Sequence, residues 1–337
     1  MSRQLRFSLK ATESPTYFNL NRYLLALDWC LASSLQKADF SDENFNFNLK
    51  ASLQLEYKHL LADLVAKNCP ELMPLTYGIN DNNWPQILNY LAKDFYFQNQ
   101  QISNQIEDLT WILKPSLLNN GQEITIFNKL SDLEQHFLSS KRLGGEHVLQ
   151  HYISDPHLLR DERKYSIRMF VIISNYAGSF LYPKGYYNVA LQPYSANNFN
   201  DLRSHLTNEH LCHEANVLQI PTNRFAEFAI LYPQIKMMMT KLMKALEQAH
   251  PEAFVSNAYR TLAIFGFDFL VDAKGRIWLL EANHGPCFPT SENHPLTNYL
   301  YDDFWKAFIN EFVLPIAVNQ EQKSIDYGSF EMLTNWQ

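Results

Sequence analysis

Residues 265–283 read FGFDFLVDAKGRIWLLEAN, two apolar runs separated by the turn-forming residues Asp-Ala-Lys-Gly. This pattern predicts a β-hairpin. If the connection has two or four residues, Asp268 and Glu281 lie on the same face, because cross-strand neighbours share a side, and Asn283 joins them. Carboxylate and amide oxygens are the ligands that Mg²⁺ prefers. The stretch therefore predicts either a magnesium site or an edge hairpin whose polar face lies in water.

A second strand is expected at residues 164–173, where Lys164, Ser166 and Arg168 alternate with apolar residues and so share one face. The apolar run 110–115 contains Lys114 and ends at a proline. Further strands are expected at 124–127 and 147–153. Helices are expected at 20–31, 53–66, 84–97 and 131–139, and a longer one from near Pro233 to His250. This mixture predicts an α+β fold.

The composition of the chain limits the classes of protein to which it can belong. The chain has 337 residues, 46% of them apolar and 19% charged, which is typical of globular proteins and long enough for two or three substructures. No apolar run reaches the ~18 residues that span a membrane, and no signal peptide begins the sequence. The net charge of −7 argues against nucleic acid as a partner. With four scattered cysteines, the sequence predicts a cytoplasmic protein with no membrane partner. It does not indicate an oligomeric state.

Residues 265–287, FGFDFLVDAKGRIWLLEANHGPC, resemble the C-terminal signature of tubulin tyrosine ligase and its relatives. Further blocks resemble the family in the same order along the chain: MPLTY at 73–77, WILKP at 111–115, VLQHYI at 148–153, RKYSIR at 163–168, LYPKG at 181–185, QPY at 192–194 and HLTN at 205–208. The resemblance thus extends from about Leu72 to Pro286.

The resemblance implies an ATP-grasp fold in which ATP lies between a central and a C-terminal domain. The expected boundaries are a small N-terminal domain at 1–70, a central domain at 71–151 and a C-terminal domain with the metal ligands at 152–337. The implied activity is an ATP- and Mg²⁺-dependent carboxylate-amine ligase. Such an enzyme modifies a protein or peptide acceptor by adding a free amino acid to it, and the reaction passes through an acyl phosphate.

The resemblance also implies roles for individual residues. Lys114 and Lys164 would neutralise the ATP phosphates, and Lys164 and Arg168 would take part in the chemistry, Arg168 by orienting the carboxylate or stabilising the acyl phosphate. The remaining assignments are Gln150, His151, Tyr152 and Ile153 along the adenine, Leu280 against the purine ring, Thr207 and Asn208 at the amino acid or γ-phosphate, and Asp268, Glu281 and Asn283 as magnesium ligands.

Simpler explanations exist for single residues. Lys114 could be a strand-end lysine in solvent, Arg168 a surface salt bridge, and Thr207 with Asn208 a helix cap. Their joint order along the chain favours the functional interpretation.

Three departures from the family pattern leave alternatives open. Ser166 stands where the family has an acidic residue, Asn188 stands where the tyrosine ligase has a second arginine, and the loop 119–124 is poor in glycine. One alternative is a pseudoenzyme that kept the fold as a binding module, and another is a small-molecule or peptide ligase. Because the chain is acidic and Asn188 is uncharged, we also expect that the acceptor is not the acidic, glutamate-rich tubulin tail, or that the contact with tubulin differs from that of the family.

Overall fold

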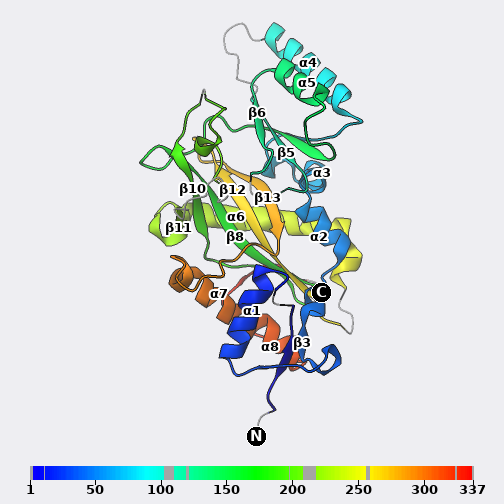
Figure 1. Ribbon diagram of the computed structural model, residues 1–337, viewed down its shortest axis with the longest axis vertical. Helices are drawn as coiled ribbons and strands as arrows, with labels where there is room; N and C mark the ends of the chain where they lie inside the picture. The colour runs from blue at the N-terminus through cyan, green and yellow to red at the C-terminus, as the bar shows by residue number, and fades with distance from the viewer. Residues whose placement is uncertain are drawn as a thin grey trace.

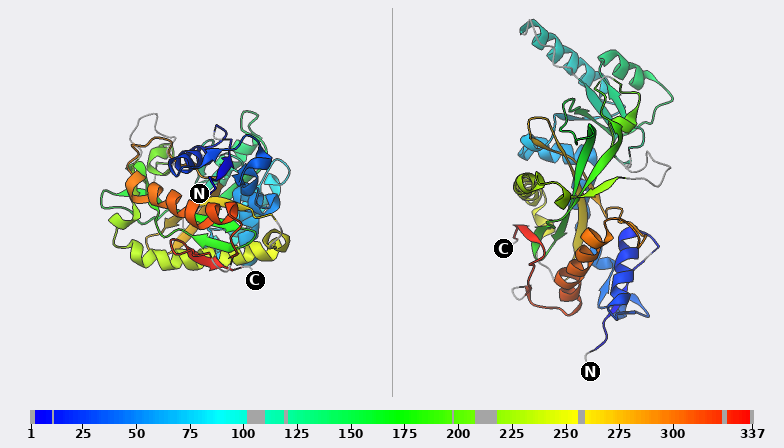
Figure 2. Two further views of the ribbon diagram at one scale, coloured as in Figure 1. Left: turned by 90° about the horizontal axis from the view of Figure 1, so that it is seen from below. Right: turned by 90° about the vertical axis from the view of Figure 1, so that its left-hand side faces the viewer.

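The computed structural model describes residues 3–10, 12–101, 110–118, 121–196, 198–207, 218–255, 259–322 and 325–335, with the backbone alone at 94–101. Helices and sheets are mixed, in agreement with the predicted α+β class. Figures 1 and 2 show an elongated molecule with three tiers: a four-stranded sheet with two helices at one end, a large sheet in the middle, and the N-terminal segment with the C-terminal helices at the other end.

The large sheet has seven strands, and each pair of neighbouring strands within it is antiparallel. Its main path runs β11-β10-β8-β12-β13, and β9 pairs with both β8 and β14. The strands are β8 (Arg163–Ser174), β9 (Gly178–Leu181), β10 (Tyr186–Pro193), β11 (Gln219–Pro221), β12 (Leu262–Val271), β13 (Ile277–His284) and β14 (Glu331–Thr334). The central pair β8 and β12 corresponds to two of the strands expected from the sequence.

The two faces of this sheet have different neighbours. The face that carries Tyr165 and Ile167 packs against α6 (Phe228–Ala249), α2 (Leu49–Glu56) and α3 (Lys58–Asn68). On the other face, Phe170 and Ile172 pack against α1 (Pro15–Ala26), α7 (Asp302–Phe308) and the helical turns that follow, including α8 (Leu314–Ala317). This second core covers only the later half of β8, because Lys164, Ser166 and Arg168 occupy the same face in the earlier half.

The smaller sheet is antiparallel, with the order β4-β7-β5-β6. Its strands are β4 (Thr76–Ile79), β5 (Trp111–Pro115), β6 (Thr125–Phe127) and β7 (His147–His151), and its helices are α4 (Trp84–Gln101) and α5 (Leu130–Leu138). A separate core lies between sheet and helices, with Leu113 and Leu149 fully buried at its centre. The expected strands at 110–115, 124–127 and 147–153 and the expected helix at 131–139 are confirmed to within a few residues.

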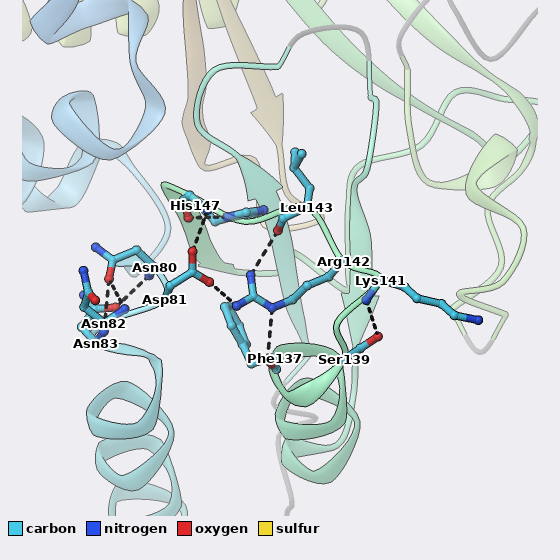
Figure 3. A network of polar contacts seen from close by, with 11 residues as sticks. Asn80, Asp81, Asn82, Asn83, Phe137, Ser139, Lys141, Arg142, Leu143 and His147 are labelled. Carbon is cyan, nitrogen blue, oxygen red and sulfur yellow. Dashed lines mark hydrogen bonds and ion pairs between the residues drawn. The ribbon is translucent and has the colours of Figure 1, made fainter.

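Asparagines hold the start of α4 to the smaller sheet (Figure 3). The side-chain oxygen of Asn80 accepts hydrogen bonds from the backbone N–H groups of Asn82 and Asn83, and the side-chain oxygen of Asn83 accepts one from the backbone N–H of Asn80. The carboxylate of Asp81 accepts from the Gly145 backbone and pairs with Arg142. These contacts satisfy backbone N–H groups of the turn before α4 and of Gly145, so the cluster has a structural role.

A parallel three-stranded sheet, β2-β1-β3, lies near the N-terminus and consists of β1 (Arg6–Ser8), β2 (Cys30–Leu31) and β3 (Phe40–Ser41). Phe7 and Phe40 belong to the core that also contains α7, whereas Leu55 and Leu61 belong to the core under α6. The first 70 residues therefore share both of their cores with the large sheet. The domain boundaries stay a prediction.

Three helices differ from the expectation. The helix expected at 20–31 spans Pro15–Ala26, because Ser14 caps it and Pro15 begins it. The helix expected at 53–66 is two helices that break at Tyr57, whose backbone is extended. Pro233 lies inside α6, which begins earlier, at Phe228. No helix among the described residues is long and apolar enough to cross a membrane.

We predict that Gly178→Ala destabilises the fold much more than Gly275→Ala. Both glycines have positive φ angles, +117° and +81°, so alanine costs about 1 kcal/mol of backbone strain at either position. At Gly178 an added Cβ would also clash with the carbonyl oxygen of Thr334 and push β14 from β9, whereas at Gly275 no atom lies within 4 Å. Chemical denaturation measures both free energies of unfolding, and equal losses would contradict the packing of β14.

Candidate functional site

A pocket lies between the smaller sheet and the large sheet. The space between its walls is about 680 Å³, part of which is open solvent. Polar residues of β5, β7, β8, β12 and β13 line it together with apolar ones: Pro74, Ile112, Lys114, Ile124, Gln150, His151, Tyr152, Ile153, Lys164, Ser166, His205, Leu206, Thr207, Asp268, Leu270, Leu280 and Glu281. Most of the residues expected from the sequence thus share one pocket.

The remaining site residues expected from the sequence lie beside the pocket or outside the described residues. Arg168 and Asn283 do not line the pocket, but each contacts Asp268. Asn208 lies outside the described residues, so its expected role stays a prediction. The apolar lining residues Pro74, Ile112, Ile124, Leu206 and Leu270 were not expected, because apolar residues with a binding role look like core residues in a sequence.

Three charged residues form one row across three neighbouring strands. Arg168 on β8 lies opposite Asp268 on β12, and Asp268 lies opposite Glu281 on β13. The same-face placement of Asp268 and Glu281 is therefore confirmed. The expected connection of two or four residues is wrong, because β12 ends at Val271 and β13 begins at Ile277.

A β-bulge produces this placement. Phe269 pairs with Leu279, whereas Asp268 pairs with Glu281, so Leu280 is an extra residue in β13. Without the bulge, Leu280 would lie opposite Asp268, and Glu281 would lie opposite Phe267 on the far face of the sheet. Both Leu280 and Glu281 line the pocket.

The guanidinium of Arg168 is held by two hydrogen bonds. Its Nε and Nη2 donate to the two carboxylate oxygens of Asp268 at 2.5 and 2.6 Å. The side chain passes close to Gly266, where an added Cβ would lie 3.0 Å from both Cδ and Nη1 of Arg168. The glycine of the FGFD motif therefore makes room for this arginine.

Lys58 belongs to the site and was missed in the sequence. Its Nζ lies 3.5 Å from Oε2 of Glu281 and donates a hydrogen bond of 2.8 Å to the carbonyl of Leu118, in the segment that follows β5. The side chain is buried although it comes from α3, in the N-terminal region. No motif surrounds Lys58 in the sequence, so only the three-dimensional contact identifies it.

The two neighbouring carboxylates have different electrostatic surroundings. Burial raises the pKa of Asp268, and Arg168 opposes this effect. Burial acts in the same way on Glu281, but nearby Lys58 and Lys114 outweigh it and hold the pKa of this group near 2. Two buried acids side by side are thus kept in place by cations from three other segments.

Two buried lysines line the same pocket as these acids. Nζ of Lys114 donates to Oε1 of Gln150 at 2.8 Å, and Nε2 of Gln150 donates to Oγ1 of Thr76 at 2.9 Å. Nζ of Lys164 donates to the hydroxyl of Tyr152 at 3.0 Å. Burial lowers the pKa of Lys114 to about 8 and that of Lys164 to about 7. No carboxylate among the described residues forms a salt bridge with either lysine, so both are suited to an incoming anion.

The acidic pair offers oxygen ligands for a hard cation. Asn283 lies 3.5 Å from both carboxylates, but the atom that faces them is Nδ2, so this amide must rotate to present its oxygen. Among the described residues, no group of three or more His, Cys, Asp and Glu side chains lies close enough together to hold a metal ion. Two carboxylates with one amide fit Mg²⁺, which binds few protein ligands and completes its shell with water and phosphate oxygens.

We predict that Lys58→Met lowers the free energy of unfolding by about 2 kcal/mol at pH 7, because it leaves Glu281 buried without its nearest cation. Ionised Glu281 stabilises the fold above its unfolded pKa of about 4.5, and this contribution is lost as the pH falls towards 2. The difference between wild type and variant should therefore shrink below about pH 4.5.

The matched control is Lys58→Met in a Glu281→Gln background, measured by urea denaturation. There the effect should be small, because only the hydrogen bond to Leu118 is lost. An equal loss in both backgrounds would mean that Lys58 does not act through Glu281.

Comparisons with known proteins show which family the chain resembles. The model of the tubulin-tyrosine ligase family matches residues 82–322. The chain is 24% identical over 257 residues to tubulin glycylase 3C of Tetrahymena thermophila, which covers 67% of this chain and 23% of that protein. It is 25% identical over 324 residues to a probable tubulin–tyrosine ligase of Saccharomyces cerevisiae, and this match covers 80% of this chain and 42% of that protein. It is also 25% identical over 293 residues to a probable tubulin polyglutamylase of Mus musculus, and this match covers 77% of this chain and 50% of that protein.

The chain thus spans half or less of the length of these curated relatives. Two of the three carry names of enzymes that add glycine or glutamate to tubulin, and the third is named as a probable tyrosine ligase. The match to the family model covers more than half of the chain. The chain therefore belongs to the tubulin-tyrosine ligase family.

Proposed function

We propose that this protein is an ATP- and Mg²⁺-dependent ligase that joins a free amino acid to a protein or peptide acceptor through an acyl phosphate. The observation that supports it most is the pairing, in one pocket, of two buried lysines with two carboxylates, the buried Asp268 and the partly buried Glu281, beside an apolar wall. A nucleoside triphosphate matches this arrangement, because its base is apolar and its phosphates need both cationic side chains and a metal ion.

The apolar wall is suited to the base and the polar side to the phosphates. Ile112, Leu206 and Leu280 would contact the purine, together with the chain at 150–153. Lys114 and Lys164 would contact phosphate oxygens. Gln150 holds Lys114 through its side chain, so we assign it a role in placing that lysine in addition to its expected position along the base.

The metal would be held by Asp268 and Glu281, with Asn283 as a third ligand after rotation of its amide. When bound, Mg²⁺ would neutralise charge on the phosphates during phosphoryl transfer. Arg168 uses two of its five donors on Asp268, so its remaining N–H groups are the candidates for orienting a substrate carboxylate.

The acceptor is the least determined part of the proposal. The tubulin-directed names of the relatives favour a protein acceptor. In the structure Asn188 lies opposite Ser166 and accepts a hydrogen bond from Gln219 at 3.1 Å, so a row of uncharged polar side chains crosses β8, β10 and β11. Such a row gives no long-range attraction to an acidic tail. We therefore keep the prediction that a glutamate-rich tail is a poor acceptor.

The function is tested by incubating the purified protein with MgATP, pooled amino acids and either tubulin or a cell lysate, followed by mass spectrometry of proteins and peptides. We expect a mass increase of one or more amino-acid residues on an acceptor. Glu281→Gln keeps the shape of the side chain but removes a ligand charge, so it should lower ATP turnover and ligation by orders of magnitude.

Three outcomes would contradict parts of the proposal. Equal turnover by wild type and Glu281→Gln would remove Glu281 from the mechanism. MgATP binding without any product would favour the pseudoenzyme. Product only on free amino acids or small peptides would favour a small-molecule ligase.

We further predict that MgATP binding takes up protons at alkaline pH. At pH 8.5 most Lys164 and much Lys114 are neutral in the free protein, because their pKa values are about 7 and about 8. Bound phosphates raise both pKa values, so about one to two protons should be taken up per site. Calorimetry in two buffers of different ionisation enthalpy measures this number. Lys164→Met should reduce it by about one, and an unchanged uptake would contradict the contact with phosphate.

A further inference from the structure

A chain of buried polar groups connects Lys164 to the segment 198–207. Nζ of Lys164 lies 3.0 Å from Oη of Tyr152, this hydroxyl lies 2.8 Å from Nδ1 of His205, and Nε2 of His205 lies 2.9 Å from the carbonyl oxygen of Asn198. Lys164, Tyr152 and His205 are each at most 6% exposed. The contacts therefore form inside the protein, where a misplaced polar group is costly.

The direction of each hydrogen bond in this chain follows from chemistry. A carbonyl oxygen can only accept, so Nε2 of His205 carries a hydrogen. Burial and the nearby Lys164 both lower the pKa of His205, so the ring is neutral and its Nδ1 is an acceptor. The hydroxyl of Tyr152 must then donate to Nδ1. This leaves its oxygen lone pairs facing Lys164, which donates to them.

Aromatic rings enclose the two groups. The ring of His205 lies 5.8 Å from that of Tyr152, 5.5 Å from that of Tyr194 and 5.3 Å from that of Phe199. Nζ of Lys164 lies 4.3 Å from the ring centre of Tyr152 and 5.8 Å from that of Tyr194. The charged groups near His205 are Lys164 and Asp201.

Tyr152 and Leu206 also belong to a small apolar cluster with Ile112 and Ile126 of the smaller sheet. The chain of hydrogen bonds thus sits where the smaller sheet meets the segment 198–207.

We propose that Tyr152 and His205 are positioning residues that hold the ammonium group of Lys164 at one point of the pocket. The proposal rests on the proposed contact of Lys164 with ATP. A lysine side chain has four rotatable bonds, so ordering it costs conformational entropy. If the side chain is already ordered in the free protein, this cost no longer weakens ligand binding. Tyr152 supplies the fixed acceptor, and His205 supplies the acceptor that orients Tyr152.

Two substitutions of His205 separate this role from a structural one. In His205→Asn the amide ends near the place of Nδ1 and can still accept from Tyr152. In His205→Gln it ends near the place of Nε2 and can still contact Asn198, but it leaves Tyr152 without its acceptor. Tyr152→Phe removes the hydroxyl itself. Tyr194→Phe is the matched control, because its ring also lies over Lys164 and its hydroxyl lies beside that of Tyr152, but this hydroxyl donates to the carbonyl of Ser154 and is not a member of the chain from Lys164 to Asn198.

The measurement is the dissociation constant of MgATP, with thermal unfolding of every variant alongside. Tyr152→Phe and His205→Gln should each weaken binding about fivefold, and the double variant no more than the stronger single one, because both break the same chain. His205→Asn and Tyr194→Phe should bind within about twofold of wild type. In turnover, KM for ATP should rise in the first two variants more than kcat falls.

The outcomes distinguish the two levels of the proposal. If wild-type protein does not bind MgATP, the proposed function fails. If it binds and Tyr152→Phe or His205→Gln bind equally well, the positioning role is wrong and the function stands. If His205→Asn and His205→Gln lose affinity equally and in proportion to their stability, His205 is only a structural anchor of its segment.

Discussion

Two carboxylates, the buried Asp268 and the partly buried Glu281, lie directly opposite each other on neighbouring strands, and cations around the pocket compensate for their repulsion. Asp268 and Glu281 would repel each other in an environment that water cannot screen. Arg168 from the adjacent strand binds one of them, and Lys58 from α3 pairs with the other. Because these cations come from distant parts of the sequence, neutralising the acid pair also joins the N-terminal helices to the large sheet.

The same constraint explains why one face of the large sheet serves two purposes. Along β8 the side chains of Lys164 and Ser166 line the pocket and Arg168 lies beside it, whereas Phe170 and Ile172 farther along the same face are packed against helices. The strand therefore passes from a ligand site into a hydrophobic core without a change of face. A rigid core next to the site limits the movement of Arg168 and of the strand that carries Asp268.

Much of this site was predictable because it depends on alternation within strands. The shared face of Lys164, Ser166 and Arg168 follows from a period of two, and the hairpin at 265–283 follows from its apolar runs and turn residues. Lys58 was not predictable, because its partner Glu281 is more than 200 positions away and no local pattern records the contact. The role of Tyr152 was also hidden, because the resemblance placed it along a base and not beneath Lys164. The break at Tyr57 shows how tertiary packing overrides an apolar period that suits one continuous helix.

The bulge at Leu280 has a mechanical consequence. Consecutive residues of a regular strand point to opposite faces, so an apolar side chain and an acidic one that follow each other would normally be separated by the sheet. The extra residue lets Leu280 and Glu281 share one wall of the pocket. The apolar half and the charged half of that wall are consequently joined by a single peptide unit. A ligand that spans both halves meets a template of fixed spacing on this side, whatever movement the smaller sheet makes on the other.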